Sequence, residues 1–151
     1  MIKIGILDKV NNTATKDLLQ NLCASIPMKI CNFHDPLDIL IINNVPKGVY
    51  GNALLSSKII VANSDDAHVL EFISTISAKI ITYGFNPKAA ITASSHIDDA
   101  FVICIQRGMS ALDGSPILPR EFIIDFKPLS QADGYVMGTV TAALICGAKL
   151  L

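Results

Sequence analysis

Charged residues are scarce in this chain. Only 17% of its 151 residues are Asp, Glu, Lys or Arg, and 12 basic residues nearly balance 13 acidic ones, which gives a formal charge of −1. The basic residues are scattered along the chain, so the sequence shows no basic cluster that would bind nucleic acid or an anionic membrane. We therefore expect neither nucleic acid nor membrane as a partner.

Signatures of metal and disulfide-exchange sites are also missing. The four cysteines show no C-x-x-C spacing, and the three histidines form neither H-x-x-x-H nor H-E-x-x-H. We expect no metal site. The cysteines are predicted to be reduced thiols that pack as small hydrophobic side chains: Cys23, Cys31, Cys104 and Cys146.

The N-terminus lacks the pattern of a secretory leader. Met-Ile-Lys-Ile-Gly resembles the start of a strand, without a basic region followed by an apolar stretch and a cleavage site. The apolar C-terminal stretch 135–151 contains Lys149 and is too short to span a membrane, so a buried helix is expected there. These features predict a cytoplasmic protein.

Apolar residues, in contrast, are abundant. They make up 51% of the chain, which excludes a disordered polypeptide and indicates a large interior. The length fits one domain, predicted over residues 1–151. So much apolar surface also suggests burial against another subunit or another protein, with a homodimer as one form.

The first half of the chain alternates short apolar runs with amphipathic stretches. This pattern is typical of parallel strands joined by crossover helices. Helices are predicted over 13–24 and Asp65–Ile76. Strands are predicted over Ile2–Leu7, Met28–Cys31, Leu37–Ile42, Lys58–Ala62 and Lys79–Tyr83. The expected fold is α/β, with a three-layer, doubly wound, mainly parallel sheet of the P-loop or Rossmann-like kind.

The pattern changes after Gly84. Strand-like runs follow over 89–93, 101–106 and 122–126, and Asp113-Gly114 with Pro116 marks a turn between the last two. We predict an antiparallel hairpin portion here, closed by a helix over about 131–148.

Three segments resemble, in the correct order, the central ATP-binding domain of the Mur ligase family. Residues 4–19, IGILDKVNNTATKDLL, are similar to the family's IGITGTNGKTTTKDLL. Residues 60–66, IVANSDD, resemble its strand end v-v-N-a-D-D, and 80–84, IITYG, its i-T-f-G. The stretch 140–147 resembles the helix that closes that domain. The resemblance implies a stand-alone homologue of this domain.

The phosphate loop is where the sequence departs from the family pattern G-x-x-G-K-T. Asp8 and Asn11 stand at the two glycine positions, and Asn12 stands where the family has Lys. Phosphoryl transfer depends on positive charge beside the phosphates, which a neutral amide does not supply. Thr13 matches the loop hydroxyl, although a role as helix N-cap also explains it. The resemblance thus implies a degenerate P-loop and lost ATP activation.

A second set of polar residues follows the strand 58–62. Asn63 and Asp66 lie at the carboxyl end of a strand, where open α/β sheets bind ligands, although Asp65 or Asp66 also suits the N-cap of the next helix. The candidate nucleotide contacts, regarded as vestigial, are Asn11, Asn12, Thr13, Asn63 and Asp66.

These observations predict a Mur ligase-like pseudoenzyme that is not an enzyme, uses no cofactor and has a binding, scaffolding or regulatory role. One alternative is a sensor that binds ATP, another nucleotide or a nucleotide sugar without hydrolysis. Another is an enzyme with unrelated chemistry near Cys104 or His96.

Overall fold

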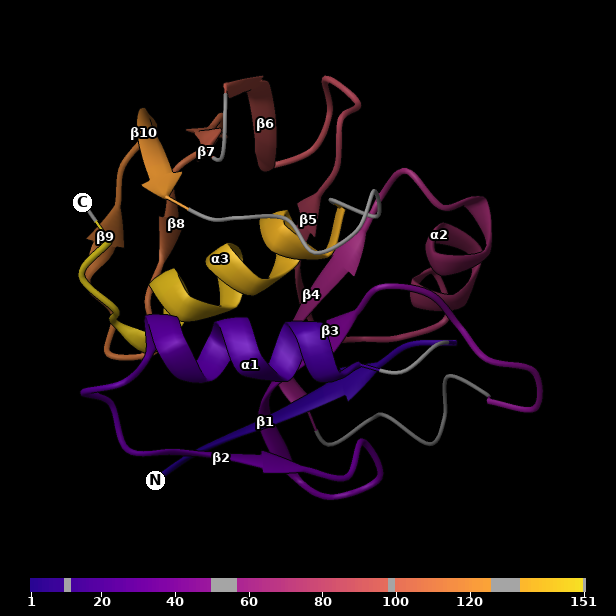
Figure 1. The fold of residues 1–151 in the computed structure, drawn as a ribbon. Helices are drawn as coiled ribbons and strands as arrows, with labels where there is room; N and C mark the ends of the chain where they lie inside the picture. Colours follow the sequence, from indigo (N-terminus) through magenta and orange to yellow (C-terminus); the bar gives the residue numbers. More distant parts are fainter. Residues whose placement is uncertain (10–11, 50–56, 98–99, 126–133, 151) are drawn as a thin grey trace.

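A computed structural model describes residues 1–9, 12–49, 57–97, 100–125 and 134–150 (Figure 1). Its main sheet has eight strands in the order β10-β7-β6-β5-β4-β3-β1-β2. The strands are β1 (Ile2–Leu7), β2 (Met28–Cys31), β3 (Leu37–Ile42), β4 (Ser57–Asn63), β5 (Lys79–Tyr83), β6 (Ile91–Ile97), β7 (Ala100–Ile105) and β10 (Arg120–Asp125). Neighbours from β2 to β6 are parallel, whereas β7 is antiparallel to both β6 and β10.

The central strands of this sheet are the continuous apolar runs of the sequence. Helices cover both faces of the sheet, so side chains on both sides of these strands are buried. In β3, Ile39, Leu40, Ile41 and Ile42 have no solvent exposure. Burying each such side chain stabilises the fold by about 1.5–3 kcal/mol relative to leaving it in water. The continuous apolar pattern therefore predicted a doubly covered parallel strand correctly.

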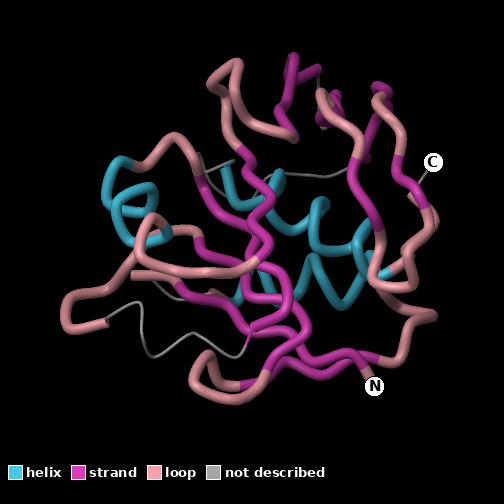
Figure 2. Tube along the Cα trace, turned by 180° about the vertical axis from the view of Figure 1, so that it is seen from behind, coloured by secondary structure: helices cyan, strands magenta, loops and turns pink. Residues whose placement is uncertain are grey.

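In the described part of the chain, three helices make the outer layers. Helices α1 (Thr13–Leu22) and α3 (Gly134–Cys146) pack on one face, and α2 (Ala67–Ile73) packs on the other. Seen from behind, the strands lie in front of α1 and α3 (Figure 2). Alternate residues of each strand serve the two cores, so Ile41 joins α1 and α3 while Leu40 joins α2. The predicted three-layer, mainly parallel α/β fold is confirmed.

Helix α3 packs against both α1 and the sheet, which explains why it is apolar on all sides. All of its residues from Val136 to Ile145 are buried. Its two buried hydroxyls are satisfied within the helix: Thr139 donates to the carbonyl of Tyr135 and Thr141 to that of Met137, both at 2.7 Å. The expectation of a buried closing helix is confirmed. Among the described residues, no helix is both long and apolar enough to pass through a membrane.

The predicted boundaries differ from the observed ones by a few residues. Helix α1 ends at Leu22 instead of residue 24, and α2 is shorter than Asp65–Ile76. Helix α3 ends before Gly147, whose φ of 95° favours glycine, and the amide of Ala148 then bonds back to the carbonyl of Ala143. The predicted helix start at 131–133 and strand end at 126 lie outside the described residues.

The antiparallel portion also holds a small sheet that the sequence pattern did not predict. Strands β8 (Met109–Ser110) and β9 (Pro116–Ile117) pair beside the main sheet. The turn between them is the predicted one: the Asp113 carboxylate accepts from the amide and hydroxyl of Ser115, at 2.9 and 2.6 Å, and Gly114 has a φ of 88°.

Candidate functional site

Polar side chains from four parallel strands meet at the carboxyl edge of the sheet. Asp8 follows β1, Asn43 follows β3, Asn63 ends β4 and Tyr83 ends β5. These strands are neighbours in the order β1-β3-β4-β5, so their ends lie side by side. Ligands of open α/β sheets bind outside this edge.

Asn43 connects the four strand ends. Its amide nitrogen donates to the Asp8 carboxylate at 3.0 Å, and its amide oxygen accepts from the Tyr83 hydroxyl. Its backbone carbonyl accepts from the Asn63 amide at 3.1 Å. Asn43 is only 4% exposed, so these bonds replace solvent that the side chain has lost.

Tyr83 is the anchor of this network on the core side. It is 1% exposed, and its ring packs against Gly138 of α3, where an added Cβ would come within 2.6 Å of the ring. Burial, together with the nearby carboxylates of Asp8, Asp65 and Asp66, raises the pKa of Tyr83. The hydroxyl therefore remains a protonated donor at neutral pH.

Asp65 closes the neighbouring loop after β5. Its carboxylate accepts from the backbone amides of Phe85 and Asn86, at 2.6 and 3.1 Å, and from the Asn86 side chain at 2.7 Å. Burial opposes ionisation of Asp65, but these hydrogen bonds prevail and lower its pKa. Gly84 permits this approach, because a Cβ there would lie 2.6 Å from the carboxylate.

Asn63 and Asp66, the two nucleotide contacts predicted near the end of β4, already form hydrogen bonds within the protein. Asp66 is the N-cap of α2 and accepts from the amides of His68 and Val69, at 2.9 and 3.3 Å. The Asn63 oxygen accepts from the Asp65 amide at 3.0 Å. Capping, which the sequence offered as an explanation of Asp66, is confirmed, while a nucleotide contact by Asn63 or Asp66 stays a prediction.

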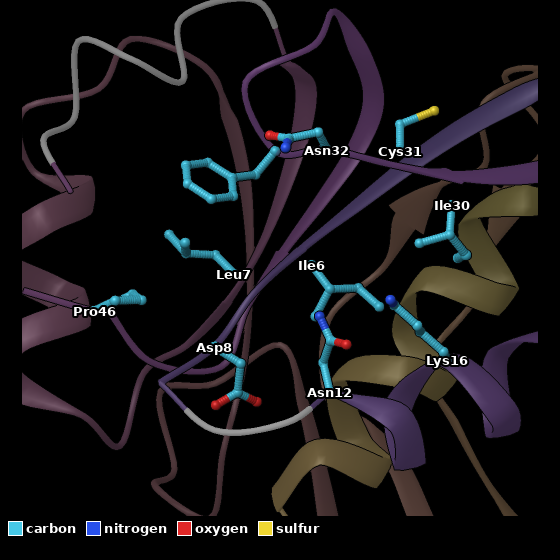
Figure 3. Close-up of a pocket in the computed structure, with 10 residues that line it drawn as sticks. Ile6, Leu7, Asp8, Asn12, Lys16, Ile30, Cys31, Asn32 and Pro46 are labelled. Atoms are coloured by element: carbon cyan, nitrogen blue, oxygen red, sulfur yellow. The ribbon is translucent and has the colours of Figure 1, made fainter.

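A pocket of about 440 Å³ opens between the end of β1 and the start of α1 (Figure 3). Asp8, Asn12 and Lys16 supply polar groups to it, and Ile6 and Ile30 are among its apolar walls. In Figure 3 the Asn12 and Lys16 side chains point toward Ile6, and the Asp8 carboxylate points away from the Lys16 amino group. An acidic and a basic group thus flank the amide of Asn12.

The residues predicted as nucleotide contacts in the loop are only partly brought together. Asn12 lines the pocket at the N-cap position of α1, with no side-chain capping bond, and Thr13 is the exposed first residue of the helix. The expected N-cap role of Thr13 is wrong, because the helix begins one residue earlier than that role requires. Asn11 lies outside the described residues.

Sequence reasoning missed Asn43, Tyr83 and Lys16 as members of the site. Asn43 and Tyr83 stand where apolar runs end, which is a signal for the carboxyl edge, but their pairing depends on strand order. Lys16 was recognisable as a cation one turn into the helix that follows the loop. Its position in the pocket comes from the helix geometry, since residues four apart share one face.

The alternative chemistry at Cys104 gains no support. Burial, and next the charge of Glu121, raise the pKa of the Cys104 thiol, which is opposite to the activation that a nucleophilic cysteine needs. The side chain of His96 lies outside the described residues.

The fold is a Mur ligase-like α/β fold. The chain superimposes on MurF from Acinetobacter baumannii with TM-scores of 0.63 and 0.64 in two crystal structures, at 10% identity, over 99% of this chain and 43% and 44% of that chain. It also matches a UDP-N-acetylmuramate:L-alanyl-gamma-D-glutamyl-meso-diaminopimelate ligase from Neisseria meningitides, with a TM-score of 0.67 and 10% identity, over 97% of this chain and 61% of that one. No family model and no curated protein sequence matches.

These structures correct one prediction. We predicted that the chain is not an enzyme, but the solved proteins that share its fold are ligases, and so enzymes. At 10% identity the likeness is one of fold, and the chain spans about half the length of the ligases.

Proposed function

We propose that this chain is a Mur ligase-like domain that binds a ligand or partner at the carboxyl edge of its sheet, without activating ATP at the phosphate loop. The observation that carries the proposal is the position of Asp8. Its carboxylate is held 3.0 Å from the amide nitrogen of Asn43, and it lines the pocket beside the loop. A fixed negative charge at a glycine position of the loop repels a triphosphate.

The second support is the lack of charge at Asn12. An amide occupies the position at which the resembling loop has a Lys, so the pocket wall beside Asp8 is neutral there. Phosphoryl transfer needs charge stabilisation at that place. Lys16 lines the same pocket one helical turn after Asn12. At this position its charge suits the binding of an anion better than the stabilisation of phosphoryl transfer.

The test is Mg-ATP binding and turnover by the wild type, by the double variant Asp8→Gly/Asn12→Lys, and by Asn21→Lys. Asn21 is exposed on α1 away from the loop, so this control adds the same charge elsewhere. We expect no ATP turnover by the wild type, and at least tenfold tighter Mg-ATP binding by the double variant but not by Asn21→Lys. Wild-type turnover that Asn12→Ala abolishes would refute the proposal.

A specific observation favours a second candidate, a nucleotide or nucleotide-sugar sensor. Lys16 and Asn12 offer a cation and an amide in a pocket of ligand size at the start of a ten-residue helix. Calorimetric titration with ATP, ADP and UDP-sugars tests it without magnesium. Saturable binding that Lys16→Ala weakens, while the exposed control Lys88→Ala does not, supports the sensor.

Absence of nucleotide binding would point instead to protein contacts. The edge strand β10 presents Ile123, which is 64% exposed, and Leu118 before it is 66% exposed. A homo-oligomer stays a prediction, and light scattering over a range of concentrations measures it directly.

A further inference from the structure

A second pocket lies between the loop that follows β3 and helix α2. Its volume is about 450 Å³, and no described residue lines both this pocket and the one beside Asn12. The segment after β3 runs along the side of the molecule on which α2 lies (Figure 1). A pocket of this size holds a small organic molecule. The site is therefore separate from the pocket on which the proposed function rests.

The pocket has an apolar wall. Val45 and Val49 of the loop and Phe72 of α2 line it, and all three are half-buried. The same side chains pack against the core cluster beneath α2, so each is supported by the core and still reaches the pocket. A phenyl ring in this position offers its face or edge to a second aromatic ring. The apolar wall thus favours a ligand with a flat aromatic body.

The charged groups of the pocket are mainly basic. Lys9 and Lys47 line it together with one acidic residue, Glu71. All three are exposed, and none of them forms an ion pair within the described part of the chain. Two ammonium groups against one carboxylate leave an excess of one positive charge, and the ring of His68 adds a further hydrogen-bonding group. This balance is complementary to a ligand with a single negative charge.

Hydrogen bonds hold the loops of the pocket in place. The backbone amide of Lys9 donates to the side-chain oxygen of Asn44 at 2.6 Å, which ties the loop after β1 to the loop after β3. The amide of Val49 donates to the carbonyl of Pro46 at 3.4 Å, in a turn where Gly48 has a φ of 82°. Loops that are ordered before a ligand arrives lower the entropic cost of binding it.

We propose that this pocket binds a small aromatic carboxylate, with the aromatic ring against Phe72 and the carboxylate beside Lys9 and Lys47. A neutral aromatic molecule would lose the charge contacts, and an aromatic cation would meet the excess positive charge. An inorganic anion would leave the apolar wall in water. Only a ligand that combines a ring with one negative charge uses both parts of the lining.

The experiment titrates isotope-labelled wild-type protein with naphthoate and follows the backbone amides by NMR. Naphthamide, which has the same ring system without the charge, is the matched probe. We expect saturable naphthoate shifts centred on Val45, Val49 and Phe72, and about fivefold weaker binding of naphthamide, the size of effect that an exposed charge pair gives.

Three variants locate the site. Lys47→Ala should weaken naphthoate binding about fivefold and leave naphthamide binding unchanged. Lys29→Ala, which removes an exposed lysine of β2, should change neither. Lys16→Ala lies in the other pocket and should also leave naphthoate binding unchanged, so a failure of one site is distinguishable from a failure of the other.

Absence of saturation by naphthoate, equal affinity for naphthamide, or shifts centred on Asn12 and Lys16 overturns the proposal. Lys47 is exposed, so its replacement should leave the fold intact, and the wild-type shift map decides the position of the ligand without any variant.

Discussion

The Tyr83 hydroxyl donates its hydrogen bond to the side-chain oxygen of Asn43, although forty residues separate the two in sequence. The side-chain nitrogen of Asn43 in turn donates a hydrogen bond to the Asp8 carboxylate. The ends of β1, β3 and β5 are thus joined by side chains as well as by the sheet. Removing a member of this network should lower the free energy of unfolding of the whole domain.

We expect Tyr83→Phe to lower the free energy of unfolding by about 1–3 kcal/mol, because it leaves a buried amide oxygen of Asn43 without its donor. The ring and its packing on Gly138 are retained, so the loss reports the hydroxyl alone. Urea unfolding followed by circular dichroism measures the change. A variant as stable as the wild type would show that water replaces the bond.

Gly138→Ala should destabilise the protein by about 1–3 kcal/mol through overpacking. The new methyl group would lie 2.6 Å from a carbon of the buried Tyr83 ring, so α3 or the ring must move. Gly134→Ala is the control in the same helix, because a Cβ there meets nothing within 4 Å. That control should be neutral or stabilising by up to about 1 kcal/mol. Equal thermal shifts in the two variants would contradict this account.

Asp66→Ala should cost about 1 kcal/mol of stability, since it removes the acceptor for two amides at the start of α2. Asp66→Asn keeps a capping oxygen and should lose much less. Chemical denaturation of both variants separates capping from charge. If Asn and Ala are equally harmful, the carboxylate acts by a route other than the cap.

Asp65 should contribute to the loss of stability in acid. Its pKa is lowered in the folded state, because its hydrogen bonds outweigh the effect of burial. Its stabilisation is therefore fully present above the unfolded pKa of about 3.9 and is lost as the pH falls through the folded value. Urea midpoints between neutral and strongly acidic pH should decline less for Asp65→Asn than for the wild type. Parallel curves would show that Asp65 carries none of the pH dependence.

Much of the fold was predictable because apolar periodicity is a local property. The run at β3 predicted a strand buried on both faces, and the run 135–151 predicted a buried helix, and both are confirmed. The pair β8 and β9 escaped prediction because strands of two residues have no measurable period. The observed helix ends differ from the predicted ones where a capping residue sets the end, as at Asp66 before α2 and Gly147 after α3.

The candidate site was predictable only in outline. The resemblance located the loop at Asp8 and Asn12, and the structure places both in one pocket. The resemblance did not indicate Asn43, because the position of this residue after an apolar run suggests the carboxyl edge but the strand order decides which residues it contacts.

The sequence by itself determined the strands and helices of this protein, since burial and propensity act over a few neighbouring residues. Only the tertiary structure decided which polar groups meet. The strand order β1-β3-β4-β5 brings Asp8, Asn43 and Tyr83 together. Such contacts form between residues far apart in the chain, and their hydrogen bonds exist only once water has been excluded from the assembled core.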